Sequence, residues 1–388
     1  MKTRTRHPLV RAVASREGDR VTTLELFFDL AFVFAFTQLS RLMAQEHDAL
    51  GVLQALVIIA LLWWAWTSYG WLSNLAHADR GVVRVAMIIG MTAMFVAGLV
   101  VLEAYDDLPG GLFGPGIFVA AYLVARVTHA VVFAWLSEPG LRRRTVITVA
   151  LSVLPSGALL IAGAVVGGPW QIWLTIAAAA VEPIVSYRTS IGVDWPVRSA
   201  THFTERHGLI VILALGESIL GIGAGAAVEP ISTAILIGVV LSVLICVALW
   251  WAYFTRLAGA AERALSSLST AERGRAATSA YTYLHLALVG GIVLAALGLE
   301  VAMAHIGSAE GYGLFGAAAL GGGVACYLAG TALFARRLLG SWGIPRLGFA
   351  VLLVLLVPAL AVVTPLVALA GVAGILLALF AVERARTV

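Results

Sequence analysis

The chain has 388 residues, of which 61% are hydrophobic and only 12% charged, and its formal net charge is +4. This balance excludes an ordinary soluble globular protein, and we expect no nucleic-acid partner. Lys2 is the single lysine, which excludes a retinal Schiff base on a membrane lysine. Cys246 and Cys326 lie inside apolar runs, which indicates lipid-embedded thiols and neither a disulfide nor a metal-binding pair.

The first 23 residues form a basic tail that carries six of the Lys and Arg residues. The apolar run that follows is too long for the core of a signal peptide, and no small-residue cleavage site closes it. We therefore expect a retained cytoplasmic tail. Its charge favours a mobile segment that lies against anionic headgroups.

The first apolar run, 24–44, carries two acids where hydrocarbon should exclude them. Thr22 and Glu25 have the S/T-x-x-E spacing of a capping box, so Glu25 has an ordinary role at a helix start. Asp29 lies one turn deeper on the same face, among phenylalanines. An ionised carboxylate there costs a few kcal/mol unless it is paired, protonated or wetted, so Asp29 is a functional candidate.

Apolar runs of membrane-spanning length recur along the whole chain. Twelve are expected, at 24–44, 50–73, 82–104, 112–136, 144–166, 170–187, 205–226, 230–254, 276–304, 313–335, 346–364 and 366–383. With the N-terminus inside, 23 of the 25 Lys and Arg residues fall on the inner side. The positive-inside rule thus predicts an all-α polytopic membrane protein with both termini in the cytoplasm. Ser269 and Glu272 form a second capping box before the ninth run.

The two halves of the chain share weak matches in the same order. Trp63-Trp64-Ala65-Trp66 corresponds to Trp250-Trp251-Ala252-Tyr253, and the Ala-Val-Glu at 180–182 recurs at 381–383. We predict two six-helix repeats, 24–188 and 205–388, separated by a cytoplasmic linker at 189–204. Because six is an even number of spans, the repeats should be parallel and related by an axis along the membrane normal.

Three stretches resemble the bacterial low temperature requirement protein A family: TTLELFFDLAFVFAFTQLS at 22–40, LLWWAWTSYGWLSN at 61–74 and HFTERHGLIVILALGESIL at 202–220. The resemblance runs over essentially the whole chain. It implies a bacterial inner-membrane protein that is needed for growth in the cold. It implies no molecular activity, and it marks five positions without assigning them roles: Glu25, Asp29, Glu205, Arg206 and Glu217.

Five candidates for a proton or substrate pathway come from four helices of both halves: Asp29, Arg126, His129, Glu217 and His285. At about 1.5 Å per residue from the inner helix end, Glu217 lies roughly 18 Å deep. Arg126 and His285 come out at about 15 and 14 Å, with His129 near 10 Å and Asp29 near 7 Å. An intramembrane arginine must be paired, and we expect the partner to be Asp29 or Glu217. The histidines have a plainer alternative, which is hydrogen bonding to carbonyl groups across helices.

Other polar and aromatic residues have structural or interfacial explanations: Glu25, Glu205, Arg206, Trp64 and Trp251. Four acids at span ends are expected at the membrane interface: Glu103, Glu182, Glu300 and Glu383. His202, Glu205 and His207 stand close in sequence, but solvation explains them better than a metal does. We expect no metal and no cofactor. The sequence has no phosphate-binding glycine loop, H-E-x-x-H, C-x-x-C or Gly-x-Ser-x-Gly.

Polar residues at membrane midplane in a six-plus-six architecture favour a secondary transporter of a small solute coupled to protons. On this hypothesis Glu217 changes protonation during transport, and Asp29 tunes it. Two alternatives stay open: a membrane enzyme that modifies lipids through Asp29 and His129, and a non-catalytic sensor or structural protein. The expected partners are the bilayer, protons and a small solute. The sequence leaves the solute and the oligomeric state undetermined.

Overall fold

The computed structural model describes residues 12–46, 48–190, 195–228 and 230–386. These residues are helical apart from short connections, and Ala14 and Ala76 form an isolated β-bridge. The all-α prediction is therefore confirmed. The chain divides into two compact units, and the division falls between Arg206 and His207. Unit 1 comprises the chain up to residue 42, 53–206 and 268–275, and unit 2 comprises 43–52, 207–267 and the chain from 276.

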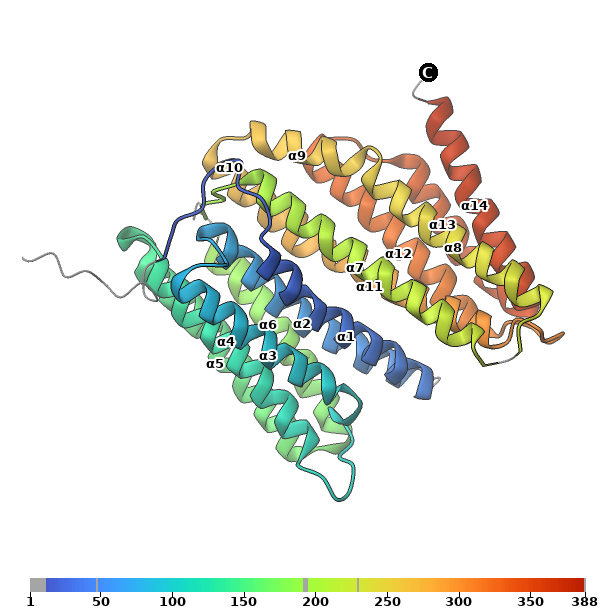
Figure 1. Ribbon diagram of the computed structural model, residues 1–388, viewed down its shortest axis with the longest axis horizontal. Coiled ribbons are helices and arrows are strands. Elements are labelled where there is room, and N and C mark those ends of the chain that lie inside the picture. The colour runs from blue at the N-terminus through green and yellow to red at the C-terminus, as the bar shows by residue number, and fades with distance from the viewer. Residues whose placement is uncertain (1–11, 47, 191–194, 229, 387–388) are drawn as a thin grey trace, which may run out of the picture. The chain divides into compact units, whose positions relative to one another are not determined.

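Unit 1 contains most of the first two helices and the four that follow them (Figure 1). Their bounds are α1 Thr23–Glu46, α2 Ala49–Leu75, α3 Gly81–Leu99, α4 Gly114–Leu136, α5 Pro139–Val166 and α6 Gly168–Ser190, with a short 3₁₀ helix, η2, at Val101–Glu103. Helix α4 packs on α3 and α5, and α5 packs on α6. The short α10, Thr270–Ala276, belongs mainly to this unit.

Unit 2 contains the larger part of α7, Ala200–Ala226, and the rest of the chain apart from α10. Its other elements are α8 Thr233–Phe254, α9 Leu257–Ser267, η3 Ala277–Leu284, α11 His285–Ala304, α12 Leu314–Leu339, α13 Ile344–Val362 and α14 Pro365–Ala385. Helix α12 packs on α11 and α13, and α14 packs on α8 and α13.

The twelve predicted apolar runs all fall on helices. Eleven helices in the described part of the chain are long and apolar enough to cross a membrane. Helix α6, which covers the predicted run 170–187, is not among them and carries Glu182 and Pro183 in its interior. A chain with this many long apolar helices is a multi-pass membrane protein, because exposed backbone groups in hydrocarbon must be satisfied within helices.

Two helix starts differ from the sequence prediction. Helix α7 begins at Ala200 and not near 205, because the Ser199 hydroxyl accepts a hydrogen bond from the His202 amide (3.1 Å) in the manner of an N-cap. The predicted run 276–304 is not one regular α-helix. It opens with the π-helix η3, and α11 begins at His285. The predicted capping box before it is confirmed, since Glu272 accepts from the amide and hydroxyl of Ser269.

Glycines bring the backbones of α11 and α12 together within unit 2. A Cβ added at Gly298 would meet the backbone of Leu320, and one added at Gly323 would meet the backbone of Ala295. Any larger side chain at either position would force the helices apart. Close contact between small residues supplies van der Waals packing where the hydrophobic effect cannot, since lipid tails are as apolar as leucine.

Candidate functional site

The start of α1 combines a helix cap with an ionic contact. Both the amide and the hydroxyl of Thr22 donate to Glu25 Oε2 (2.8 and 2.9 Å), and the Glu25 amide lies 3.4 Å from the Thr22 hydroxyl. The predicted capping box is therefore confirmed. The other carboxylate oxygen, Oε1, lies 2.9 Å from Nε2 of His202 and 3.5 Å from Nε of Arg206. Glu25 thus has a second set of contacts, with helix α7.

Asp29 lies one turn further along α1 and is also paired. Its Oδ2 accepts from Nη1 of Arg206 at 2.8 Å, and its Oδ1 accepts from the indole Nε1 of Trp66 at 2.8 Å. Both Asp29 and Arg206 have 0% side-chain exposure. A fully buried ion pair is strongly destabilised if one member is removed, because the other charge is left uncompensated.

The Arg206 guanidinium is enclosed by aromatic rings and by α1. Its Nη1 also donates to the main-chain oxygen of Glu25 (3.0 Å), and its carbon lies 5.6 Å from the Phe28 ring centroid and 5.3 Å from that of Trp66. A cation that lies above the face of an aromatic ring is stabilised by the ring electrons. Both Glu25 and Arg206 have 0% side-chain exposure, which agrees with the structural explanation that the sequence left for them.

The tautomer of His202 follows from its neighbour Asn74. Oδ1 of Asn74 accepts from the Arg198 amide (2.8 Å), and Nδ2 donates to the Ser199 main-chain oxygen (2.7 Å). These two backbone contacts determine the orientation of the amide. The second Nδ2 hydrogen then faces Nδ1 of His202 at 3.2 Å. Nδ1 must accept, so His202 is neutral and carries its hydrogen on Nε2, where it donates to Glu25.

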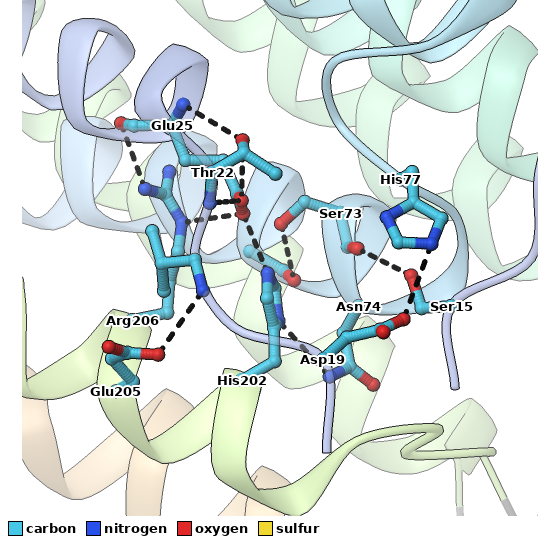
Figure 2. Close-up of polar contacts among 12 residues, drawn as sticks. Ser15, Asp19, Thr22, Glu25, Ser73, Asn74, His77, His202, Glu205 and Arg206 are labelled. Carbon is cyan, nitrogen blue, oxygen red and sulfur yellow. Dashed lines mark hydrogen bonds and ion pairs between the residues drawn. The ribbon is translucent and has the colours of Figure 1, made fainter. Parts of the chain in front are cut away.

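We call Glu25, Asp29, His202 and Arg206 the α1–α7 cluster, and Figure 2 shows three of its members, Glu25, His202 and Arg206. In the arrangement just described it holds two carboxylates, one guanidinium and a neutral imidazole. With both acids ionised, its net charge is therefore −1. All of its members belong to unit 1. A residual charge on fully buried side chains is costly, and one additional proton would remove it.

The segment before α1 closes one side of this cluster. The Ser15 hydroxyl donates to the Ser73 main-chain oxygen (3.2 Å), Nε2 of His77 lies 3.3 Å from Oδ2 of Asp19, and the Val21 amide donates to Glu205 (3.2 Å) (Figure 2). The prediction of a mobile tail is therefore wrong for residues 12–22, whose backbone and side chains are bonded within unit 1. Residues 1–11 lie outside the described residues.

Arg126 forms a second buried ion pair, and the predicted partners are wrong. Its Nε and Nη2 lie 2.8 and 2.5 Å from Oε2 of Glu182, and its Nη1 donates to the Ser68 hydroxyl at 2.5 Å. The Tyr122 hydroxyl donates to the other Glu182 oxygen at 3.1 Å. We call Arg126 and Glu182 the α4–α6 ion pair. Asp29 is already occupied by Arg206, which is the physical reason that it does not serve Arg126.

The Glu182 side chain is 1% exposed, and helix α6 continues for about two turns beyond it to Ser190. His129 lies one turn from Arg126 on α4, where its ring stacks on Phe133 (centroids 5.2 Å apart) and meets Tyr69 (5.7 Å). The structure thus groups His129 with aromatic rings beside the α4–α6 ion pair.

The remaining pathway candidates lie in unit 2. Glu217 is 1% exposed on α7. His285 is fully buried at the junction of η3 and α11, where its Nδ1 lies 3.1 Å from the Ala280 main-chain oxygen and its Nε2 2.8 Å from the Tyr253 hydroxyl. A carbonyl can only accept, so Nδ1 carries the hydrogen and Nε2 accepts from Tyr253. Its ring stacks on Tyr281 with centroids 4.9 Å apart. The only carbonyl among these partners belongs to Ala280, five residues earlier in the chain, and the partner on another helix is the Tyr253 hydroxyl.

The comparisons with known proteins agree with this picture at the level of family. The model of the bacterial low temperature requirement A protein (LtrA) matches residues 20–381. The chain belongs to this family. An uncharacterized protein of Rhizobium meliloti (strain 1021) is 30% identical over 321 residues, which cover 79% of this chain and 75% of that protein. No solved structure matches this chain.

In this LtrA family member, the three stretches that carried the resemblance supply most of the site. The stretch 61–74 contains three contributors that the sequence analysis did not single out: Trp66, Ser68 and Asn74. Trp64 is half-buried, and Trp251 is 51% exposed in unit 2. A tryptophan cluster near a helix end has an ordinary interfacial explanation, so the sequence alone does not single out Trp66. Its contact with Asp29 joins positions 37 residues apart and is seen only in the folded protein.

His202 was considered for a metal site with Glu205 and His207, and the structure assigns the three to different surroundings. His202 contacts Glu25 and Asn74, and Glu205 accepts from Val21. The His207 ring lies against Tyr281 and His285 in unit 2. Within the described residues, no group of three or more His, Cys, Asp or Glu side chains could hold a metal ion.

Proposed function

We propose that this LtrA family protein is a secondary transporter that couples the movement of a small solute to that of protons, and that the α1–α7 cluster is a proton-binding site. The observation that carries the proposal is that two carboxylates of the cluster are buried against a single guanidinium. Two carboxylates at 0% exposure face one arginine and a histidine held in its neutral form. Uptake of a proton neutralises the excess negative charge of such a site. A change in the surroundings of the site can then favour release of the proton.

The number of hydrogen-bond donors favours Asp29 as the proton acceptor. Glu25 receives three donors, the amide and the hydroxyl of Thr22 and Nε2 of His202, and they stabilise its ionised form together with the nearby charge of Arg206. Asp29 receives one from Trp66 and one from Arg206. A proton on His202 would place two donors face to face at the Asn74 amide. The additional proton therefore goes to Asp29 in this proposal.

Protonation of Asp29 would alter the contact between two helices. Asp29 is on α1 and Arg206 on α7, and their ion pair is one of the bonds that join the two elements within unit 1. A neutral Asp29 holds Arg206 less strongly, so the proton shifts the balance between arrangements that differ in this contact. Helix α2 links the cluster to the α4–α6 ion pair, since Trp66 binds Asp29 and Ser68 binds Arg126.

Glu217 is the second proton-binding group in the proposal. It is buried in the interior of α7, roughly 18 Å from the inner end of the predicted span, whereas Asp29 lies near 7 Å. An ionisable residue at that depth in a membrane is a functional candidate by default, and for Glu217 the role that we propose is proton relay. His285 has a different role: it holds η3 to α8 through Tyr253. Removal of either proposed proton group should stop proton movement.

The topology in this proposal is that of a bacterial inner-membrane protein with both termini in the cytoplasm, supported by the distribution of Lys and Arg. The two parallel six-helix repeats, 24–188 and 205–388, also belong to the proposal. Superposition of residues 24–188 on residues 205–388 in an experimental structure would test them. Helices of the first half should match those of the second in chain order without inversion, and a match only after inversion would contradict the repeat.

The deciding experiment uses purified protein in liposomes that contain a pH-sensitive dye, with a panel of organic cations, organic anions, amino acids and sugars added outside. We expect at least one solute to drive a change of internal pH. Asp29→Asn should remove that change, whereas Glu138→Gln, which alters a mostly exposed carboxylate, should not. Solute uptake that is identical in the presence and absence of a pH gradient would contradict proton coupling.

A second candidate function is supported by the complete burial of the cluster, which suits a purely structural role in setting helix register. The protein would then be a sensor or structural component and not a transporter. The two candidates differ in one measurement. A structural cluster predicts that Asp29→Asn changes stability alone, with no solute in the panel moving protons in either protein.

A further inference from the structure

Unit 2 has a groove of about 800 Å³ whose lining comes from α8, α14 and the start of α13. The α8 contribution follows the i, i+3, i+4, i+7 spacing of one helix face with Leu244, Val247, Ala248 and Trp251, and Thr255 lines the groove just beyond the end of that helix. The α14 contribution, Leu377, Phe380, Ala381 and Arg384, follows the same spacing. The groove is therefore built by two apolar helix faces, and Trp251 and Leu377 are about half exposed in it.

One end of the groove is cationic. Arg256, Arg346 and Arg384 line it together with a single acid, Glu383. They lie just after the end of α8, at the start of α13 and at the end of α14, so the three helices present them on one side of the unit. Three guanidinium groups against one carboxylate leave a formal charge of +2 beside an apolar channel.

Arg346 is oriented for a ligand at this end. Its Nε lies 2.7 Å from Oε1 of Glu383, and its Nη2 donates to Oε2 at 3.4 Å. The side chain is 12% exposed, and its Nη1 has no hydrogen-bonding partner among the described residues. The pair with Glu383 fixes the plane of the guanidinium at the cationic end of the groove, where its positive charge would attract the phosphate of a lipid.

We propose that this groove binds an anionic phospholipid, with the phosphate at Arg346, Arg256 and Arg384 and the acyl chains along α8 and α14. A free anion would match the arginines but not the apolar faces of Trp251 and Leu377. A zwitterionic lipid would match the apolar faces but brings no net charge to the +2 end. Basic pockets between membrane helices bind anionic headgroups for this reason. The site is independent of proton coupling, because none of its residues belongs to the α1–α7 cluster.

The experiment is native mass spectrometry of the full-length protein, delipidated in detergent and titrated with phosphatidylglycerol or phosphatidylcholine of identical acyl chains. We expect the protein to retain phosphatidylglycerol in preference. Arg346→Gln should lower its retention roughly tenfold or more, as expected for the loss of a charge-assisted hydrogen bond. Arg384→Gln, an exposed position that leaves the Arg346–Glu383 pair in place, should also weaken it. Ala381→Trp should block the groove.

Arg142→Gln is the matched control, because it removes an exposed arginine from α5 in unit 1. Equal retention of the two lipids would overturn the proposal, as would equal losses in Arg142→Gln and Arg384→Gln. A third titration uses inorganic phosphate alone. Competition by phosphate at concentrations comparable to those of the lipid would show a free-anion site and overturn the lipid assignment. A dimer that Arg384→Gln dissociates would show that a second copy occupies the groove.

Discussion

Asn74 determines the protonation state of His202 through a single hydrogen. Its amide nitrogen lies 2.7 Å from the Ser199 main-chain oxygen and 3.2 Å from Nδ1 of His202. We predict that His202 is neutral with its hydrogen on Nε2, and that Asn74→Asp makes it a cation by turning the donor into an acceptor. Nitrogen NMR of histidine-labelled protein would show this, with His202→Gln to identify the signals. An imidazolium in the unmutated protein at neutral pH would contradict the assignment.

Arg206 balances two buried carboxylates, so its removal should be costly. We predict that Arg206→Leu lowers the free energy of unfolding by about 3–5 kcal/mol. Asp29→Asn in the same chain should recover part of the loss, because it neutralises one of the two stranded acids. Arg198→Gln is the control. It removes a partly exposed pair with Glu138 (3.3 Å), which should matter by at most about 1 kcal/mol. Reversible unfolding in mixed detergent micelles measures each value.

Arg126 and Glu182 should behave as one unit. We predict that Arg126→Leu destabilises by about 3–5 kcal/mol and that Arg126→Leu combined with Glu182→Leu recovers much of the loss. The same arginine change combined with Glu217→Gln should recover nothing, since the acid that Arg126 contacts is Glu182. A double-mutant cycle gives the coupling energy directly. A coupling near zero for Arg126 and Glu182 would show that the pair is not maintained in the membrane.

Glu217→Gln should fold as well as the unmutated protein and stop proton movement in liposomes. The substitution keeps the shape of the side chain and removes its capacity to carry a proton. Growth of a deletion strain in the cold, complemented with either protein, extends the test to the cell. Full complementation together with unchanged proton movement would remove Glu217 from the proposed pathway and favour a structural role for it.

Reporter fusions test the topology without reference to function. Fusions after residues 47, 107, 168, 228, 308 and 365 should report the outer side, and a fusion at residue 388 the cytoplasm. The reason is the bias of 23 of the 25 Lys and Arg residues toward one side. A C-terminus on the outer side would mean an odd number of spans and would also remove the parallel repeat.

Particular residues show which features the sequence determines by itself. The spans follow from apolar length, because a membrane protein must satisfy its backbone within helices, and the twelve predicted runs fall on the observed helices. The capping boxes at Thr22 and Ser269 follow from local spacing alone. The family and the candidacy of Asp29 follow from the quoted stretches and from the cost of a charge in hydrocarbon. All of these depend on neighbours in sequence or on the surrounding bilayer.

Only the tertiary structure decides which charges meet. Asp29 and Arg206 are 177 positions apart, and Arg126 and Glu182 are 56 apart, so no local pattern connects them. A depth estimate along each helix places residues on one level but gives no rotation about the helix axis. It therefore did not separate Glu182 from Asp29 or Glu217 as the partner of Arg126. Rotation is set by how whole helix faces pack, as with Trp66 against Asp29. That packing is a property of the folded unit.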